Sequence, residues 1–257
     1  MLGRRAAAAL LAPLLTLPLK PNAAHADVKE EIRKAASVVP GYGPSDLLFP
    51  NAFQGRWKVT RSVVDVQYPL GKDKAPREEV ALAERQLEAG AAGVSFDARY
   101  VETDDPGAFG DKVIPDRAFN AERRASALQG LPLDDLEARW SSSNPNVVTM
   151  RNRRIGSVVE TKVTKRSVEG ENGAFGTSEY ARVADAGSEG VLGGVPRILA
   201  TRERVRYRYP VDGGRPTRIE GLEITDLFDP TQTGFADLAG ASPVLKVKAR
   251  LTLERIR

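Results

Sequence analysis

The fold class is decided by the segment LKVKARLTLE at residues 245–254. Its apolar side chains occupy every second position from Leu245 to Leu253, and charged or polar side chains fill the positions between them. Successive side chains of a β-strand point to opposite faces of the sheet. The alternation therefore predicts a strand with one buried face and one face in water.

Strand patterns recur on the N-terminal side of this segment. We expect strands at residues 55–68, 93–100, 147–155, 157–168, 175–183, 198–209, 217–227 and 243–256. The sequence Asp212-Gly213-Gly214 is typical of a hairpin turn between two of them. About eight mostly antiparallel strands with an apolar face favour an up-and-down β-barrel over a sandwich, because closure leaves no unpaired edge strand.

Two helical insertions are expected within this barrel. Residues 74–90 carry an apolar stripe at helical spacing, formed by Val80, Ala83 and Leu87, and Gly90 provides a stop. Residues 119–140 look like a second insertion, helical or irregular, which Gly130-Leu131-Pro132 interrupts. We therefore expect residues 46–257 to form a single, mainly β domain with short helical insertions.

The N-terminus has the pattern of an export signal. Arg4 and Arg5 precede an apolar run, and Ala24-His25-Ala26 fits a cleavage site, which makes residues 1–26 a cleavable signal peptide. An uncleaved anchor is the alternative, although a spanning helix needs roughly 20 apolar residues. Residues 27–45 are expected to form a short helix and a linker that ends in Pro40-Gly41-Tyr42-Gly43-Pro44.

The charge of the expected mature chain gives no support for nucleic-acid binding. The whole chain has 38 Lys and Arg against 34 Asp and Glu; three of the basic residues and none of the acidic ones precede Asp27, so 35 and 34 remain. A domain that binds a phosphate backbone needs a standing basic excess. Any basic function must therefore be local.

The residue types that are missing exclude most common enzymes. The chain has no cysteine, and its single histidine, His25, lies in the expected signal peptide. Without these residues a mature chain cannot form a Ser-His-Asp or Cys-His site, a histidine-ligated zinc or a thiol redox centre. Only carboxylate chemistry remains, and we expect no catalytic residues, no metal site and no cofactor.

The tripeptide Gly55-Arg56-Trp57 opens the first expected strand. Together with arginines on the last strand it resembles the calycin or lipocalin arrangement, in which a G-x-W tryptophan plugs one end of the barrel and a C-terminal arginine packs across it. The resemblance implies a plug formed by Gly55, Trp57 and Arg250, with Arg255 further along the strand. Barrels of about eight strands have either a filled interior or room for one small ligand.

A row of four arginines is the main candidate for partner binding. At period two, Arg202, Arg204, Arg206 and Arg208 share one face of a strand over roughly 20 Å. Lys246 and Lys248 add positive charge on the wet face of the last strand. The alternative is that cross-strand acids satisfy these arginines, notably Glu220 and Glu223 across the hairpin. Two glutamates cannot pair with four arginines, so some positive surface should remain.

The runs LFPNAFQGRWKVTR at residues 48–61 and VQYPLG at residues 66–71 are similar to a family of thylakoid-lumen proteins of plants, green algae and cyanobacteria that carry a domain of unknown function. The strands around Tyr207-Arg208-Tyr209 and residues 247–251 resemble its β-rich C-terminal half. Within that family the chain looks most like a green-algal member associated with photosystem II repair. The resemblance implies a chloroplast thylakoid-lumen location, photosystem II core subunits as partners and no enzyme activity. A bacterial periplasmic protein stays open.

Three function classes remain. The leading one is a non-enzymatic factor that docks on the lumenal side of photosystem II, without spanning the membrane, and assists its assembly or repair. The second is a lipocalin-like carrier of a lipid, carotenoid or other pigment, which predicts an apolar cavity. The third is a carboxylate enzyme, which requires acids that converge in a pocket with perturbed pKa values.

Overall fold

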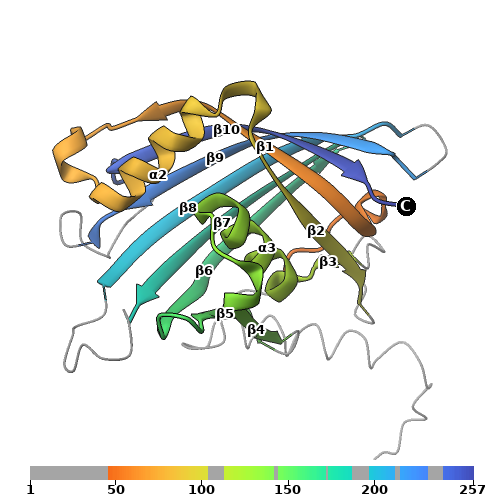
Figure 1. The fold of residues 1–257 in the computed structure, drawn as a ribbon. Helices are drawn as coiled ribbons and strands as arrows, with labels where there is room; N and C mark the ends of the chain where they lie inside the picture. The colour runs from red at the N-terminus through yellow and green to blue at the C-terminus, as the bar shows by residue number, and fades with distance from the viewer. Residues whose placement is uncertain are drawn as a thin grey trace, which may run out of the picture.

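Ten antiparallel strands form a single sheet that curls around a core into a barrel-like shape (Figure 1). This computed structural model describes residues 46–103, 113–141, 144–171, 173–186, 197–211, 215–230 and 240–257. The strands are β1 Gly55–Gln67, β2 Val94–Glu102, β3 Val113–Pro115, β4 Leu136–Ser141, β5 Asn144–Asn152, β6 Ser157–Glu171, β7 Ala174–Asp185, β8 Arg197–Arg208, β9 Arg218–Phe228 and β10 Leu245–Arg255. The α-helices are α2 Arg77–Glu88 and α3 Arg117–Gln129, and the 3-10 turns are Asn51–Phe53, Lys72–Lys74, Gly90–Ala92 and Leu133–Asp135.

The order of strands in the sheet explains the curl. From one edge to the other it is β3-β2-β1-β10-β9-β8-β7-β6-β5-β4, so the last strand inserts beside the first and every other neighbour is adjacent in sequence. β3 and β4 are the two edges and do not pair with each other. The expected barrel therefore stays open along one side as a sheet.

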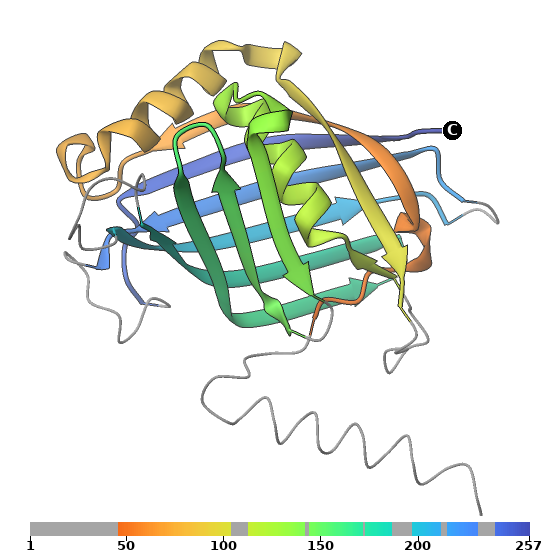
Figure 2. The ribbon, with the colours of Figure 1, turned by 60° about the horizontal axis from the view of Figure 1, so that its bottom comes forward.

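Helix α3 occupies that open side (Figure 2). Asn120 hydrogen-bonds to the backbone of Arg99 on β2, and the carboxylate of Glu122 accepts a hydrogen bond from Ala138 N on β4 at 2.7 Å. Unpaired strand edges expose backbone groups that need partners. The polar side chains of α3 supply these partners on both sides of the gap, so a helix closes the barrel in place of a further strand pair.

Two apolar clusters fill the ends of the curl. The first surrounds Trp57 and Phe53, both with no exposed surface, and contains Leu253 and Ile219 from the neighbouring strands β10 and β9. The second lies beneath α2, where Val80 and Ala83 pack among Val63, Leu199 and Leu245. Burying such side chains contributes roughly 1.5–3 kcal/mol each for the larger ones. The clusters anchor the two ends, and a charged layer separates them.

The expected strands are found, with two more at the edges. Each of the eight predicted strands overlaps one of β1, β2 and β5–β10. The predicted count of about eight is wrong because β3, only three residues long, and β4, which overlaps the predicted helical insertion 119–140, were not expected. The closed barrel is wrong because β3 and β4 are edges that do not pair. Helix α3 ends at Gln129, since Gly130 adopts a left-handed conformation at φ 71° and Pro132 follows it.

Some predictions fall on residues that lie outside the described ones. These are the signal peptide at 1–26, the helix and linker at 27–45, and the turn Asp212-Gly213-Gly214. The strands that flank this turn, β8 and β9, pair antiparallel as expected. Helix α2 begins and ends within the predicted range 74–90. In the described part of the chain, the helices are too short or too polar to cross a membrane.

Candidate functional site: a basic outer face and a charged interior

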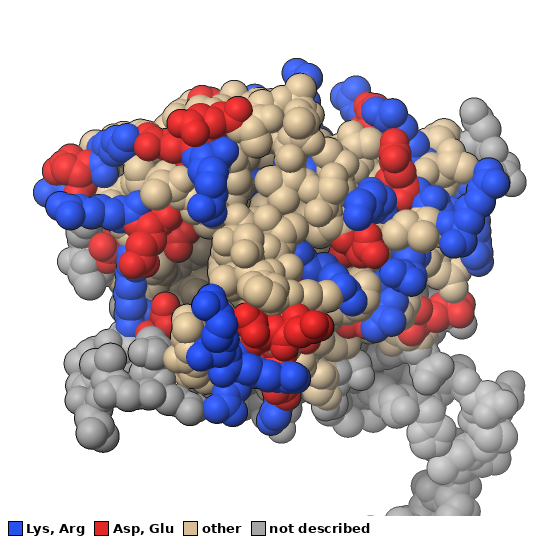
Figure 3. All heavy atoms as spheres, in the orientation of Figure 1, with Lys and Arg blue, Asp and Glu red and all other residues tan. Residues whose placement is uncertain are grey.

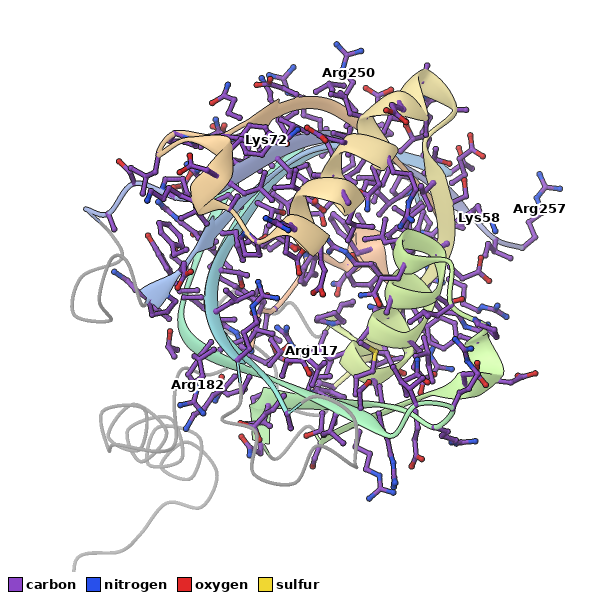
Figure 4. The ribbon with its side chains drawn as sticks, turned by 60° about the vertical axis from the view of Figure 1, so that its left-hand side comes forward. Lys58, Lys72, Arg117, Arg182, Arg250 and Arg257 are labelled. Carbon is purple, nitrogen blue, oxygen red and sulfur yellow. The ribbon has the colours of Figure 1, made fainter. Side chains whose placement is uncertain are left out.

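The four arginines of β8 lie on the outer face of the sheet. Val205 and Tyr207, between them in sequence, are buried in the interior. On β10 the same alternation directs Lys246, Lys248 and Arg250 outward, while Val247 and Ala249 are buried. Figure 4 shows Arg250 pointing away from the curl. The structure thus places both predicted basic groups on one side of the sheet.

Strand register brings these residues into rows across β8, β9 and β10. Arg206 lies opposite Leu222, which lies opposite Arg250, and the next row is Arg204, Ile224 and Lys248. A third row joins Arg202 and Lys246 through Asp226. Neighbouring strands are roughly 4.8 Å apart, so the two basic columns are about 10 Å apart. We call this surface the basic face: it comprises Arg202, Arg204, Arg206, Arg208, Lys246, Lys248 and Arg250.

Acidic partners neutralise one end of the basic face. Asp226, whose side chain is 5% exposed, accepts a hydrogen bond from Arg204 Nη2 at 2.6 Å and lies 3.9 Å from Lys246 Nζ. Arg202 stacks on Tyr180, with Cζ 4.8 Å from the ring centroid. Arg206 has only a long contact with Glu169, at 3.6 Å between two exposed side chains. The basic side chains at this end therefore mainly make contacts within the protein.

The other end of the basic face keeps its charge. Among the described residues, Arg208, Lys248 and Arg250 have no carboxylate within ion-pair distance, and Arg208 and Arg250 are exposed. Leu222, 37% exposed, lies between Arg206 and Arg250. A surface with guanidinium and ammonium groups around an exposed leucine is suited to an acidic partner that also carries apolar side chains.

The prediction that Glu220 and Glu223 neutralise the arginines of β8 is wrong. Glu223 points into the interior, because it shares the inward positions of β9 with Ile219, and it is 2% exposed. Glu220 does lie outward, but its carboxylate pairs with Arg218 at 3.1 Å. Asp226 and Glu169 take the roles predicted for these glutamates.

The plug at one end of the barrel uses Arg255. The guanidinium carbon of Arg255 lies 4.2 Å from the centroid of the Trp57 ring, and the indole Nε1 donates to the carbonyl of Phe53 at 2.6 Å. Arg255 also donates to the carbonyls of Ala52 and Gln54. The expectation that Arg250 packs across Trp57 is wrong, because only odd-numbered positions of β10 face inward.

Gly55 is required at this plug for two reasons. Its φ is +115°, a conformation that side chains with a Cβ rarely adopt. A Cβ at this position would also approach within 2.9 Å of Arg255 Nη1. Gly55, Trp57 and Arg255 therefore form one structural unit.

The middle of the barrel contains a buried ion network that was not predicted. Arg61 of β1, 5% exposed, donates through Nε to Glu223 at 2.8 Å, and Arg124 of α3 donates to the other oxygen of Glu223 at 2.9 Å. Arg124 also pairs with Glu203 at 3.1 Å. Burial disfavours the charge of Glu223, but Arg124 and Arg61 hold its pKa below the usual range.

A second group of ion pairs joins α3 to the N-terminal segment and to β6 and β7. Arg117 contacts Asp46 at 2.6 Å and Glu179 at 2.9 Å, and Arg166 contacts Glu179 at 2.5 Å. Figure 4 shows Arg117 inside the curl. Burial disfavours the charge of Glu179, yet Arg117 and Arg166 hold its pKa below the usual range. Arg117 and Arg124 are seven residues apart and so lie on one face of α3.

This network determines where a ligand has room. Four arginines and four carboxylates fill the middle of the curl, so the barrel is not an apolar tube. A pocket of about 450 Å³ lies beyond them, between α2, the end of α3 and strands β4–β8. The hollow is visible below α2 in Figure 3. Its charged lining residues are Glu78, Glu79, Arg85, Asp185 and Arg197.

The described residues contain no group of side chains suited to hold a metal ion. No curated protein and no solved structure matches the chain. Residues 41–257, which are most of the chain, match the model of a domain of unknown function, DUF6816. The chain therefore belongs to the DUF6816 family.

Proposed function

We propose that this protein is a non-enzymatic factor of the thylakoid lumen that docks through its basic face on the lumenal side of photosystem II and assists assembly or repair. The observation that carries the proposal is the register that places the basic residues of β8 and β10 in common rows. The thylakoid-lumen location and the photosystem II partner are what the sequence resemblance implies. The basic face supplies the surface with which such a partner would be bound.

The charge distribution favours a protein partner with an acidic surface. Arg208 lies on β8 and both Lys248 and Arg250 lie on β10, with β9 hydrogen-bonded between them, so binding would order little backbone. Charge pairs at the rim of an interface mainly accelerate association and fix orientation. The complex should therefore weaken as salt is added, since the Debye length falls from about 10 Å at 0.1 M to about 3 Å at 1 M.

The proposal is tested by charge reversal on the basic face. Arg206, Lys248 and Arg250 are replaced together by glutamate, which leaves the Arg204–Asp226 pair intact. The control replaces Lys74, Arg77 and Arg182 by glutamate. These side chains are exposed away from the basic face, and their replacement gives the same change in net charge. Both proteins are added to solubilised thylakoid membranes that lack the native protein, and native electrophoresis shows the complex with which each migrates.

The expected result is that the control migrates with photosystem II subcomplexes and the basic-face variant migrates alone. Exposed charges contribute about 0–1 kcal/mol to stability, so both variants should fold. If the two variants migrate alike with photosystem II, the basic face is not the interface. If the unmodified protein migrates alone, the partner itself is wrong.

The pocket favours a second candidate function, the carriage of a small molecule. Its volume of about 450 Å³ lies within the usual range of ligand sites, roughly 300–1,000 Å³. The volume suits a single short chain or ring better than a carotenoid or a two-chain lipid. Absorption spectroscopy and mass spectrometry of the purified protein test this candidate, because a carrier would retain a ligand.

A further inference from the structure

The pocket beneath α2 combines an apolar lining with a charged mouth. Half of its sixteen lining residues are apolar: Leu82, Leu131, Leu136, Met150, Ile155, Val159, Val183 and Leu199. They come from α2, from the segment after α3 and from five strands. An apolar cavity with a few polar groups at its rim is the usual form of a small-molecule site.

Glu79 is the distinctive polar group of this pocket. It lies in the first turn of α2, half-buried, and burial raises the pKa of its carboxyl while Arg197 acts in the opposite direction. Arg197 itself pairs with the neighbouring Glu78 at 3.3 Å. Within the described residues, Glu79 has no hydrogen bond or ion pair of its own. A partly desolvated carboxylate without a partner is costly and gains from a donor that a ligand brings.

The other charges around the pocket also favour a cationic head. Glu78, Glu79 and Asp185 contribute three carboxylates, against the guanidinium groups of Arg85 and Arg197. The Arg197–Glu78 pair cancels internally. Arg85 donates to the carbonyl of Leu128 at 3.4 Å and keeps its positive charge. Together the charged lining residues carry one more negative than positive charge, which attracts an ammonium and repels a ligand carboxylate.

We infer that this pocket binds a single-chain amphiphile with a protonated amine head, whose ammonium pairs with Glu79 and whose chain packs against Leu82, Val183 and Leu199. The inference rests on the second candidate function and is independent of docking through the basic face. The ion pair requires an ionised Glu79. Affinity should therefore fall as pH is lowered through the raised pKa of the Glu79 carboxyl. The other charged groups that line the pocket around it are Glu78, Asp185, Arg85 and Arg197.

Isothermal titration calorimetry of the full chain with octylamine, octanol and octanoate tests the inference. The three probes share a chain and differ in head charge. Octylamine should bind roughly tenfold or more tightly than octanol, as expected for one hydrogen bond to a charged group, and octanoate should bind most weakly. In Glu79→Gln the advantage of octylamine over octanol should disappear. Glu88→Gln, at an exposed glutamate of the same helix that does not line the pocket, is the matched control and should keep it.

A third variant locates the site. Val183→Phe narrows the pocket and should weaken octylamine and octanol together, and circular dichroism checks that each variant is folded. Equal affinity of the unmodified protein for octylamine and octanol overturns the assignment of the amine head and leaves the carrier function standing. Failure of all three probes to bind overturns both the assignment and the carrier function. Binding that survives Val183→Phe unchanged places the site elsewhere and also overturns the inference.

Discussion

Asn120 of α3 makes the hydrogen bonds that a neighbouring strand would make to Arg99 of β2. Its Oδ1 accepts from Arg99 N at 2.7 Å and its Nδ2 donates to the Arg99 carbonyl at 3.0 Å. β3 pairs only with residues Tyr100–Glu102 of β2, so the edge ends at the position where Asn120 begins to cover it. One amide side chain thus lets a helix complete the sheet.

Replacing Asn120 by alanine should lower the free energy of unfolding by about 1–2 kcal/mol, because the partly buried Arg99 N loses its hydrogen-bond acceptor. Asn120→Asp keeps the acceptor and loses only the donor, and the Arg99 carbonyl still accepts from Asp116 N at 3.0 Å. Urea denaturation should therefore rank the aspartate variant between the alanine variant and the native protein. Equal stability of all three would show that α3 does not hold this edge.

The ion network in the middle of the barrel predicts a measurable loss of stability from a single change. In Arg124→Met, Glu223 keeps Arg61 but Glu203 loses its cation, and burial already raises the pKa of Glu203. Because the Glu203 side chain is 37% exposed, water screens it in part, and the loss should be about 1–3 kcal/mol. The double variant Arg124→Met, Glu203→Gln should recover part of this loss in the same urea titration. No recovery would mean that Glu203 is not the group left unpaired.

Stability should fall in acid, partly through Glu179. The folded pKa of this carboxyl is lowered, so its contribution is complete above the unfolded pKa, near 4.3, and is lost as pH falls through the folded value. Glu203, with a raised pKa, acts in the opposite sense. The measurement is therefore a difference: below about pH 5, Glu179→Gln should lose less stability per pH unit than the native protein. Parallel curves would contradict the role of Arg117 and Arg166.

The plug predicts that two changes at one end of the barrel are not additive. Gly55→Ala should cost about 1–3 kcal/mol, because it strains a backbone at φ +115° and displaces Arg255. Arg255→Met removes the group that the new methyl would contact. Thermal unfolding of the two single variants and the double variant should give a combined loss smaller than the sum. Strict additivity would show that Gly55 and Arg255 act separately.

Eight of the strands could be predicted from the sequence because side-chain alternation is clear in strands such as β8 and β10. The prediction failed at β3 and β4, since three residues show no period and β4 follows a helix within one polar stretch. The outward basic residues followed from the same alternation. The interior ion network was missed, although Arg61 shares its parity with Trp57, Val59 and Val63 on β1. A charged residue at an inward position was the available signal, but its partners come from strands distant in sequence.

The basic face should separate into structural and docking residues when each arginine is removed alone. Arg204→Met leaves Asp226, 5% exposed, with only the distant Lys246, so the free energy of unfolding should fall by about 2–3 kcal/mol. Arg208→Met removes an exposed charge and should change stability by less than about 0.5 kcal/mol. In the docking assay the order should reverse, with Arg208→Met binding more weakly than Arg204→Met at a temperature where both are folded. Because Arg204 forms an ion pair with Asp226 within the protein, only the arginines beyond that pair are available to an acidic partner. Equal stability of the two variants, or stronger loss of docking in Arg204→Met, would contradict this division.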